Sequence, residues 1–254
     1  MAVVLRRVDS ELGCWTHAEW TPDEGDPLAG AIDRIWDFDG TLNSARERTF
    51  PNGMVELIVQ LDEPHRAVHE AVTGAHFPAV CVGGLMTTAG VVEAPPRRCR
   101  VLGVRLHPVG AFAVLAEPLH AIAEATVDLR DVLGRAASEL GERCFDAPNG
   151  AARVGIAARW AAERIARANH VDPVIALAVR RIAQAGGQAP IGEIQAESGL
   201  PRARFVASFR EHAGVSPKRF ARVVRFRRAL AMHQRLELRH VPSIGVKNLF
   251  AYLP

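Results

Sequence analysis

The 254-residue chain lacks the features that mark membrane and secreted proteins. It has no run of about 18 uncharged apolar residues, so no membrane span is predicted and no membrane partner is expected. Residues Met1 to Arg7 lack the apolar stretch and cleavage site of a signal peptide. The four cysteines are widely spaced and form no CxxC pair, which argues against a zinc knuckle or a redox motif. We therefore expect a cytoplasmic protein with reduced thiols.

Common catalytic and phosphate-binding motifs are also missing. The chain has no P-loop, no GxGxxG after a strand, and no recognisable Ser/His/Asp set. His65 and His69 are four residues apart and could share a metal ion if they lay on a helix. We interpret them as loop histidines near the surface, and His107 as a structural residue at a strand end. We expect no catalytic residue, no metal and no cofactor, and hence no enzymatic activity.

One segment resembles an enzyme motif. Residues 37–42 read DFDGTL, which is similar to the nucleophile motif of haloacid-dehalogenase-type phosphatases. That resemblance implies that Asp37 attacks phosphorus, that Asp39 acts as acid and base, and that Mg²⁺ binds both. The chemistry also needs a later lysine and an acidic pair, and neither Lys218 nor Lys247 precedes a Gly-Asp-x-x-x-Asp pattern. We keep the phosphatase as a minor alternative and interpret the segment as part of a β-hairpin.

The first part of the chain has the pattern of a β-rich module. Its short apolar runs are broken by glycine and proline. The runs at residues 55–61, 78–84 and 101–106 are short, and we predict a strand at each. Pro51-Asn52-Gly53 before the first run is a turn signal. We expect a barrel or sandwich over residues 1–145.

From about Asp128 onward, alanine dominates and the apolar spacing approaches 3.6 residues. This pattern predicts helices at residues 128–140 and 151–168, and residues 146–150 (DAPNG) are the best linker candidate. Asp172 and Pro173 form an N-cap and a first helical position, so another helix begins there and ends at Gly186-Gly187.

Charge is distributed unevenly along the chain. The segment from Pro190 to Arg239 has 11 Lys/Arg and 4 Asp/Glu, whereas residues 1–189 have 19 and 24. One basic segment on an acidic body indicates a polyanionic partner. A basic helix that is merely solvated is the alternative interpretation.

The basic segment has the pattern of a helix-turn-helix. Residues 190–197 predict a short helix, and Gly199 suits the left-handed conformation of a tight turn. Pro201 then opens a second helix, whose inner face carries Phe205 and Phe209 at positions i and i+4. Its outer face offers four polar side chains: Arg202, Arg204, Ser208 and Arg210. A basic helix of this kind fits the DNA major groove, where arginine can donate two hydrogen bonds to guanine.

A longer helix is predicted to follow, with Ser216 as its cap and Pro217 at its first position. Its arginines, which include Arg225, Arg227 and Arg228, could contact phosphate. We predict that the bases are contacted by Arg202, Arg204 and Ser208. We predict that the phosphates are held by Arg210, Lys218, Arg219 and Arg222.

The stretch from Ile191 to Leu230 resembles the first helix-turn-helix of AraC/XylS-type transcription regulators. The matching segments are GLPRARF, SFREHAGVSPKRF and ARVVRFRRAL. Upstream, ERTFPNGMVELIVQL and RRCRVLGVRLHPVGAF resemble the cupin-like N-terminal domain of one branch of these regulators. The resemblance implies an α+β protein, with a cupin-like sensory or dimerisation domain over residues 1–145 and an all-α DNA-binding domain over residues 150–254. The implied partners are double-stranded DNA, a small-molecule effector and a second copy of the chain.

The chain departs from the family in two respects. The family usually has Ser at the position of Pro201 and often has Arg at those of Ala203 and Ala207. Family members also carry a second helix-turn-helix, but only some 20 residues follow Met232 and they do not resemble that unit. We therefore expect a truncated DNA-binding domain that lacks one groove contact per protomer. The rival hypothesis is a truncated modulator that dimerises through its N-terminal domain and does not bind DNA.

Overall fold

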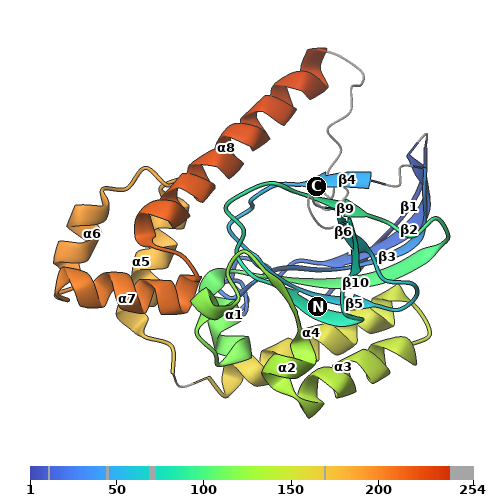
Figure 1. Cartoon of the computed structure of the whole chain (residues 1–254), viewed down its shortest axis with the longest axis horizontal. Helices are drawn as coiled ribbons and strands as arrows, with labels where there is room; N and C mark the ends of the chain where they lie inside the picture. Colours follow the sequence, from blue (N-terminus) through green and yellow to red (C-terminus); the bar gives the residue numbers. More distant parts are fainter. Residues whose placement is uncertain (11, 44–45, 69–72, 169, 241–254) are drawn as a thin grey trace.

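The computed structural model describes residues 1–254 except 11, 44–45, 69–72, 169 and 241–254. Strands fill the first part of the chain and helices the second, so the predicted α+β class is confirmed (Figure 1). The end of the C-terminal tail, residues 241–254, lies outside the described residues. Among the described helices, none is long and apolar enough to cross a bilayer.

The larger sheet in the described part of the chain has seven strands, and every neighbouring pair is antiparallel. Its spatial order is β1 (Val4–Ser10), β2 (Gly13–Trp20), β3 (Ile32–Leu42), β10 (Cys99–Leu106), β5 (Val55–Gln60), β8 (Val80–Gly83) and β11 (Thr126–Asp128). The strands predicted from the three apolar runs are confirmed as β5, β8 and β10.

A smaller sheet is formed by β4 (Arg46–Thr49), β9 (Gly90–Glu93), β6 (Arg66–Val68) and β7 (Thr73–His76), in that order. Side chains alternate between the two faces of a strand, and β5 shows what each face of the larger sheet covers. Its Val55, Leu57 and Val59 belong to the main apolar core. Glu56 and Ile58 point to the other side, where they line a cavity shared with the smaller sheet.

Helices pack on the core face of the larger sheet: α1 (Pro108–Leu115), α2 (Leu129–Leu133), α3 (Arg135–Phe145) and α4 (Gly150–Ala166). The helix predicted over residues 128–140 is two helices, because Gly134 at φ +54° interrupts it. The predicted linker is the loop between α3 and α4. Helix α4 packs against β3, β2 and α3, although the sequence grouped it with the C-terminal helices. The domain division near residue 145 stays a prediction.

The remaining helices are α5 (Pro173–Gln184), α6 (Ile191–Glu197), α7 (Arg202–Ala213) and α8 (Pro217–His240). Helix α8 projects as a long rod away from the other three (Figure 1). Helix α7 packs against α1 and against the short helix η1 (Leu119–Ala121). One apolar cluster includes Val55 and Leu106 of the sheet together with Phe112 and Phe209 of the helices. The C-terminal helices therefore share a continuous core with the β-rich part.

Candidate nucleic-acid interface

The turn between α6 and α7 is fixed by side-chain hydrogen bonds. Gly199 has φ +67°, as the sequence predicts. Gln195 Nε2 donates to the carbonyl oxygen of Leu200 at 2.7 Å. Ser198 Oγ donates to the carbonyl oxygen of Gln195 at 2.5 Å and accepts from the Leu200 amide at 3.2 Å. These hydrogen bonds fix the turn that joins the two helices, and both helices lie where the sequence predicts them.

The inner face of α7 is a row of aromatic rings. Phe205 and Phe209 are 1% and 0% exposed, and their ring centroids are 6.0 Å apart. Phe209 also lies 5.9 Å from the ring of Phe220, which belongs to α8. These contacts hold α7 against α8 and leave the opposite side of α7 facing outward.

His212 connects the end of α7 to the β-rich part. Its ring lies 4.0 Å from the ring of Phe112 in α1. Nε2 accepts a hydrogen bond from the Asp172 amide at 3.0 Å, and Nδ1 donates to the carbonyl oxygen of Ser208 at 2.9 Å. This arrangement requires the neutral ring, and burial lowers the pKa of His212 accordingly. The orientation of α7 is therefore set by contacts on several sides.

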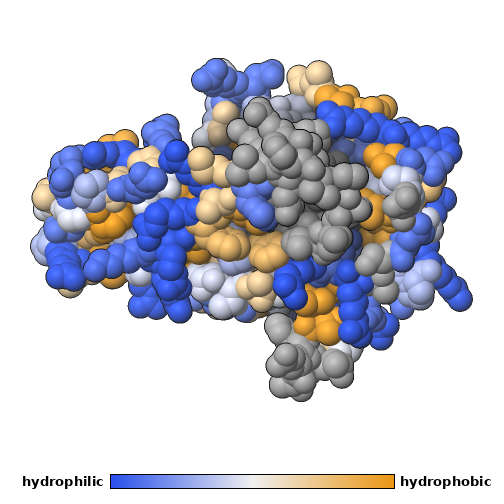
Figure 2. Space-filling view, turned by 90° about the horizontal axis from the view of Figure 1, so that it is seen from above, coloured by the Kyte–Doolittle hydropathy of each residue, from blue (hydrophilic) through white to orange (hydrophobic). Residues whose placement is uncertain are grey.

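Six of the seven predicted DNA contacts are exposed: Arg202, Arg204, Arg210, Lys218, Arg219 and Arg222. The seventh, Ser208, is half-buried. None of the six charged side chains forms an ion pair with a residue of the described chain. The end of the molecule that contains α6 and α7 is mainly hydrophilic, with small apolar patches (Figure 2).

The outermost ridge of α7 carries two alanines. An α-helix turns by roughly 100° per residue, so Ala203 and Ala207 lie almost opposite Phe205, and both are exposed. Arg204 and Arg210 flank this ridge. Arg202, by the same geometry, lies close to the buried side and reaches outward from the first turn. Sequence reasoning treated the two alanines only as departures from a family pattern and did not place them at the centre of the face.

Two arginines of α8 donate hydrogen bonds to backbone oxygens of other segments, although Arg225 is exposed and Arg227 is half-buried. Arg225 Nη1 donates to the carbonyl oxygen of Gly187 at 2.6 Å. Arg227 Nη1 donates to the carbonyl oxygen of Asn52 at 3.5 Å, and its Nη2 lies 3.9 Å from Asp33. Both side chains therefore have partners within the chain, and a phosphate contact by either of them stays a prediction. They fasten α8 to its neighbours, and no pattern in the sequence indicates their partners.

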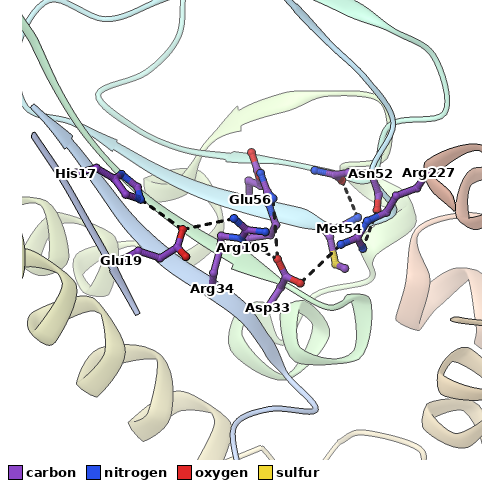
Figure 3. A network of polar contacts seen from close by, with 9 residues as sticks. All are labelled: His17, Glu19, Asp33, Arg34, Asn52, Met54, Glu56, Arg105 and Arg227. Atoms are coloured by element: carbon purple, nitrogen blue, oxygen red, sulfur yellow. Dashed lines mark hydrogen bonds and ion pairs between the residues drawn. The ribbon is translucent and has the colours of Figure 1, made fainter. Parts of the chain in front are cut away.

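Arg227 belongs to a polar network that crosses the larger sheet (Figure 3). Arg105 Nε donates to Glu56 at 2.5 Å, and Arg105 Nη1 lies 3.9 Å from Asp33. Burial opposes the ionisation of Asp33, but Arg105, Arg227 and Arg34 outweigh it and lower the pKa of that carboxyl. Asp33 is therefore an anion that joins Arg227 of α8 to Arg105 of the sheet.

The DFDGTL segment forms part of β3, which pairs with β2 as a hairpin, in agreement with the interpretation from sequence. Asp37 is 2% exposed, and its carboxylate accepts from Arg153 Nε at 2.6 Å and from Arg153 Nη2 at 3.0 Å. Burial raises the pKa of Asp37, and Arg153 opposes that rise. Asp39 accepts from Arg98 Nε at 2.7 Å. Both carboxylates are engaged by arginines, which disfavours a nucleophilic role.

The structure describes only one of the two histidines, His65 and His69, that the sequence placed four residues apart. His69 lies outside the described residues. His65 lies in the loop before β6, as interpreted from the sequence, but it is 8% exposed, so its expected position near the surface is wrong. His107 is half-buried at the N-cap of α1. Within the described residues, no three His, Cys, Asp or Glu side chains gather to hold a metal ion.

Residues 21–128 match a family model described as a domain of unknown function, DUF6597. This match covers less than half of the chain and lies within its β-rich part and the first helix. No curated protein matches the chain.

Three solved structures are distantly similar to this chain over most of its length. An AraC-like transcriptional activator, CuxR, is 14% identical with a TM-score of 0.36, over 91% of this chain and 86% of that chain. Native PhpD with cadmium atoms is 10% identical with a TM-score of 0.27, over 84% of this chain. A variant of 2-hydroxyethylphosphonate dioxygenase is 11% identical with a TM-score of 0.26, also over 84% of this chain. The similarity covers 49% of the length of PhpD and 48% of the length of the dioxygenase. These similarities are too low to assign a function.

Proposed function

We propose that the protein is a DNA-binding transcription regulator that inserts α7 into the major groove of double-stranded DNA and has no enzymatic activity. The observation that carries this proposal is the asymmetry of α7. One face is held by the aromatic row from Phe205 to Phe220, and the opposite face presents arginines without ion pairs to the described chain.

Exposed cationic side chains without an ion-pair partner in the described chain favour a polyanion. Phosphate contacts from Arg210, Lys218, Arg219 and Arg222 would supply affinity without reading sequence. Arg202, Arg204 and Ser208 would contact the base edges. The small side chains of Ala203 and Ala207 let the helix backbone approach the groove closely, and a methyl group there can contact thymine.

The test is fluorescence anisotropy with duplexes from the region upstream of the gene, at several salt concentrations between about 50 and 200 mM. We expect Arg210→Ala and Lys218→Ala to weaken binding to all duplexes and to reduce the slope of log affinity against log salt by about 1 each. We expect Arg204→Ala to cost about 1–3 kcal/mol and to relax sequence preference.

Arg135→Ala is the matched control, because Arg135 is 88% exposed on α3 and its ion-pair partner in the described chain is Glu139. It removes one positive charge and leaves the proposed interface intact. The proposal is refuted if the interface variants bind DNA as the control does, or if the wild-type protein shows no preferred duplex and no salt dependence.

A second candidate is a modulator that associates with a copy of itself without binding DNA. The observation in its favour is β1, an edge strand of the larger sheet, whose Val4 and Leu5 are 51% and 68% exposed. An exposed edge strand offers unpaired backbone groups to another chain. Sedimentation of the wild type and of Leu5→Lys would test this association, and the DNA titrations would separate the two candidates.

A further inference from the structure

A cavity of about 550 Å³ lies between the two sheets. This volume is within the range of about 300–1,000 Å³ that is typical of small-molecule sites. Much of the wall is apolar, with Met54 and Ile58 from β5 and the turn before it, Val91 from β9, and Phe77 beyond β7. A ligand with an apolar body would bury its surface against these side chains.

The lining of the cavity includes a hydrogen-bonded pair, Gln60 and His65. Gln60 Nε2 donates to the carbonyl oxygen of Pro78 at 3.2 Å. The other end of the Gln60 side chain, Oε1, is therefore free to accept hydrogen bonds from His65. Oε1 accepts from the His65 amide at 2.6 Å and from His65 Nδ1 at 3.0 Å. The proton of the neutral ring is therefore on Nδ1, and Nε2 carries a lone pair. No residue of the described chain bonds to that atom.

The charged groups of the lining are acidic. Glu56 and Glu124 line the cavity, whereas no Lys or Arg of the described chain does so. Glu56 gives one oxygen to Arg105, and Glu124 lies exposed, where it accepts from the Thr87 amide. Burial lowers the pKa of His65 to about 4, so this side chain supplies no positive charge at neutral pH. His76 also lines the cavity, and its Nδ1 is hydrogen-bonded to the carbonyl oxygen of Pro64. A carboxylate or phosphate in the cavity would therefore lose its hydration without gaining a Lys or Arg partner from the described chain.

We propose that this cavity binds a small apolar molecule that carries a hydrogen-bond donor, an amine or a hydroxyl, that it excludes anions, and that its occupancy acts on α8. The first part does not depend on DNA binding. The last part rests on the proposed function, because a shift of α8 has a consequence only if α7 and α8 meet DNA.

The wall of the cavity is also the surface that contacts α8. Phe50 and Asn52 line the cavity. The ring of Phe50 lies 6.1 Å from the ring of Phe226, and the carbonyl oxygen of Asn52 accepts from Arg227. Glu56 reaches the same arginine through the network of Figure 3. A ligand that moves Phe50, Asn52 or Glu56 therefore changes contacts of α8.

Calorimetry on the full chain without DNA tests the site. The probes are phenethylamine, phenethyl alcohol and hydrocinnamate, which share a phenyl group on a short chain and differ in the charge of the polar group. We expect the amine and the alcohol to bind at least about tenfold more tightly than the carboxylate, a difference of about 1.4 kcal/mol. Equal or tighter binding of the carboxylate would overturn the proposal, as would the absence of binding by all three.

Cavity-filling variants locate the binding. Ile58→Trp should abolish binding of the amine, whereas Leu177→Trp, at a position 53% exposed on α5, should leave it unchanged. If Ile58→Trp does not fold, Ala67→Trp on β6 serves the same purpose, because Ala67 lines the cavity from the smaller sheet. Undiminished binding to a folded cavity-filling variant would place the ligand elsewhere and refute the site.

Hydrogen exchange of α8 tests the coupling. Saturating phenethylamine should change amide protection in α8 by at least about twofold in the wild type and by less in Arg227→Ala, in which the link to Asp33 is missing. Unchanged protection in a protein shown to be saturated would refute the coupling and leave the binding site standing. Failure of DNA binding would instead refute the proposed function and leave both results intact.

Discussion

The substitution Phe209→Ala tests whether the aromatic row holds α7 in position. Phe209 is 0% exposed and has aromatic neighbours on two sides, Phe205 at 6.0 Å and Phe220 at 5.9 Å. Truncating a buried phenylalanine to alanine costs about 3–5 kcal/mol, through lost transfer energy and the cavity left behind. Because both neighbours also lose an aromatic contact, we expect a value near the upper end of that range.

The assay is thermal and urea denaturation followed by circular dichroism, together with DNA titration. For a chain of this size, 1 kcal/mol shifts Tm by about 2–4 °C, so a loss of about 4 kcal/mol lowers Tm by about 8–16 °C if unfolding is cooperative. If the C-terminal helices unfold separately, helical signal and DNA binding are lost first and the sheet melts later.

Phe226→Ala is the matched control, because Phe226 is 41% exposed on α8 and contacts Phe50 from the surface. We expect it to cost far less, on the order of 1 kcal/mol. Similar losses for the two variants, or an unchanged melting profile for Phe209→Ala, would show that the aromatic row does not support α7.

Three further predictions concern the β-rich part and its junction with α8. Arg153→Ala leaves the buried carboxylate of Asp37 unpaired and should cost about 3–5 kcal/mol in chemical denaturation, whereas Arg135→Ala should stay within about 0.5 kcal/mol; equal effects would refute the structural role of the pair. The pKa of His65 is lowered from 6.5 to about 4, so the unfolded chain binds a proton that the folded chain does not in this window. The free energy of unfolding is therefore undiminished above pH 6.5 and decreases by up to about 3 kcal/mol as the pH is lowered from 6.5 to below 4. The variant His65→Gln should lose this pH dependence. Gly187 has φ +75°, and a Cβ there would lie 2.2 Å from the carbonyl oxygen of Ala221, so Gly187→Ala should displace α8 from α5 and weaken DNA binding at least tenfold; unchanged anisotropy titrations would contradict this.

The phosphatase alternative has its own test. The protein should not hydrolyse p-nitrophenyl phosphate with Mg²⁺, because Arg153 already occupies both oxygens of Asp37. Hydrolysis that is lost in Asp37→Asn would refute this expectation and restore the motif to a catalytic role.

The sequence alone predicted the elements whose signals are local. The turn at Gly199, the proline before α7, and the phenylalanines at positions i and i+4 lie within a short stretch of chain. Residues this close meet through helix geometry, whatever the rest of the fold does. The same holds for β5, β8 and β10, which are short apolar runs between turn signals.

Only the tertiary structure decided which residues meet across the chain. Asp37 and Arg153 are 116 residues apart, and Arg227 and Asn52 are 175 apart, so neither pair leaves a local pattern. The same applies to the cavity, whose walls come from strands of two sheets. A charged residue in the sequence shows that its side chain needs either a polar partner or water. The sequence does not show which residue is the partner, because the packing of sheets and helices decides that. For this reason the basic character of α7 and α8 was visible in the residues, while the bonds of Arg225 to Gly187 and of Arg227 to Asn52 were not.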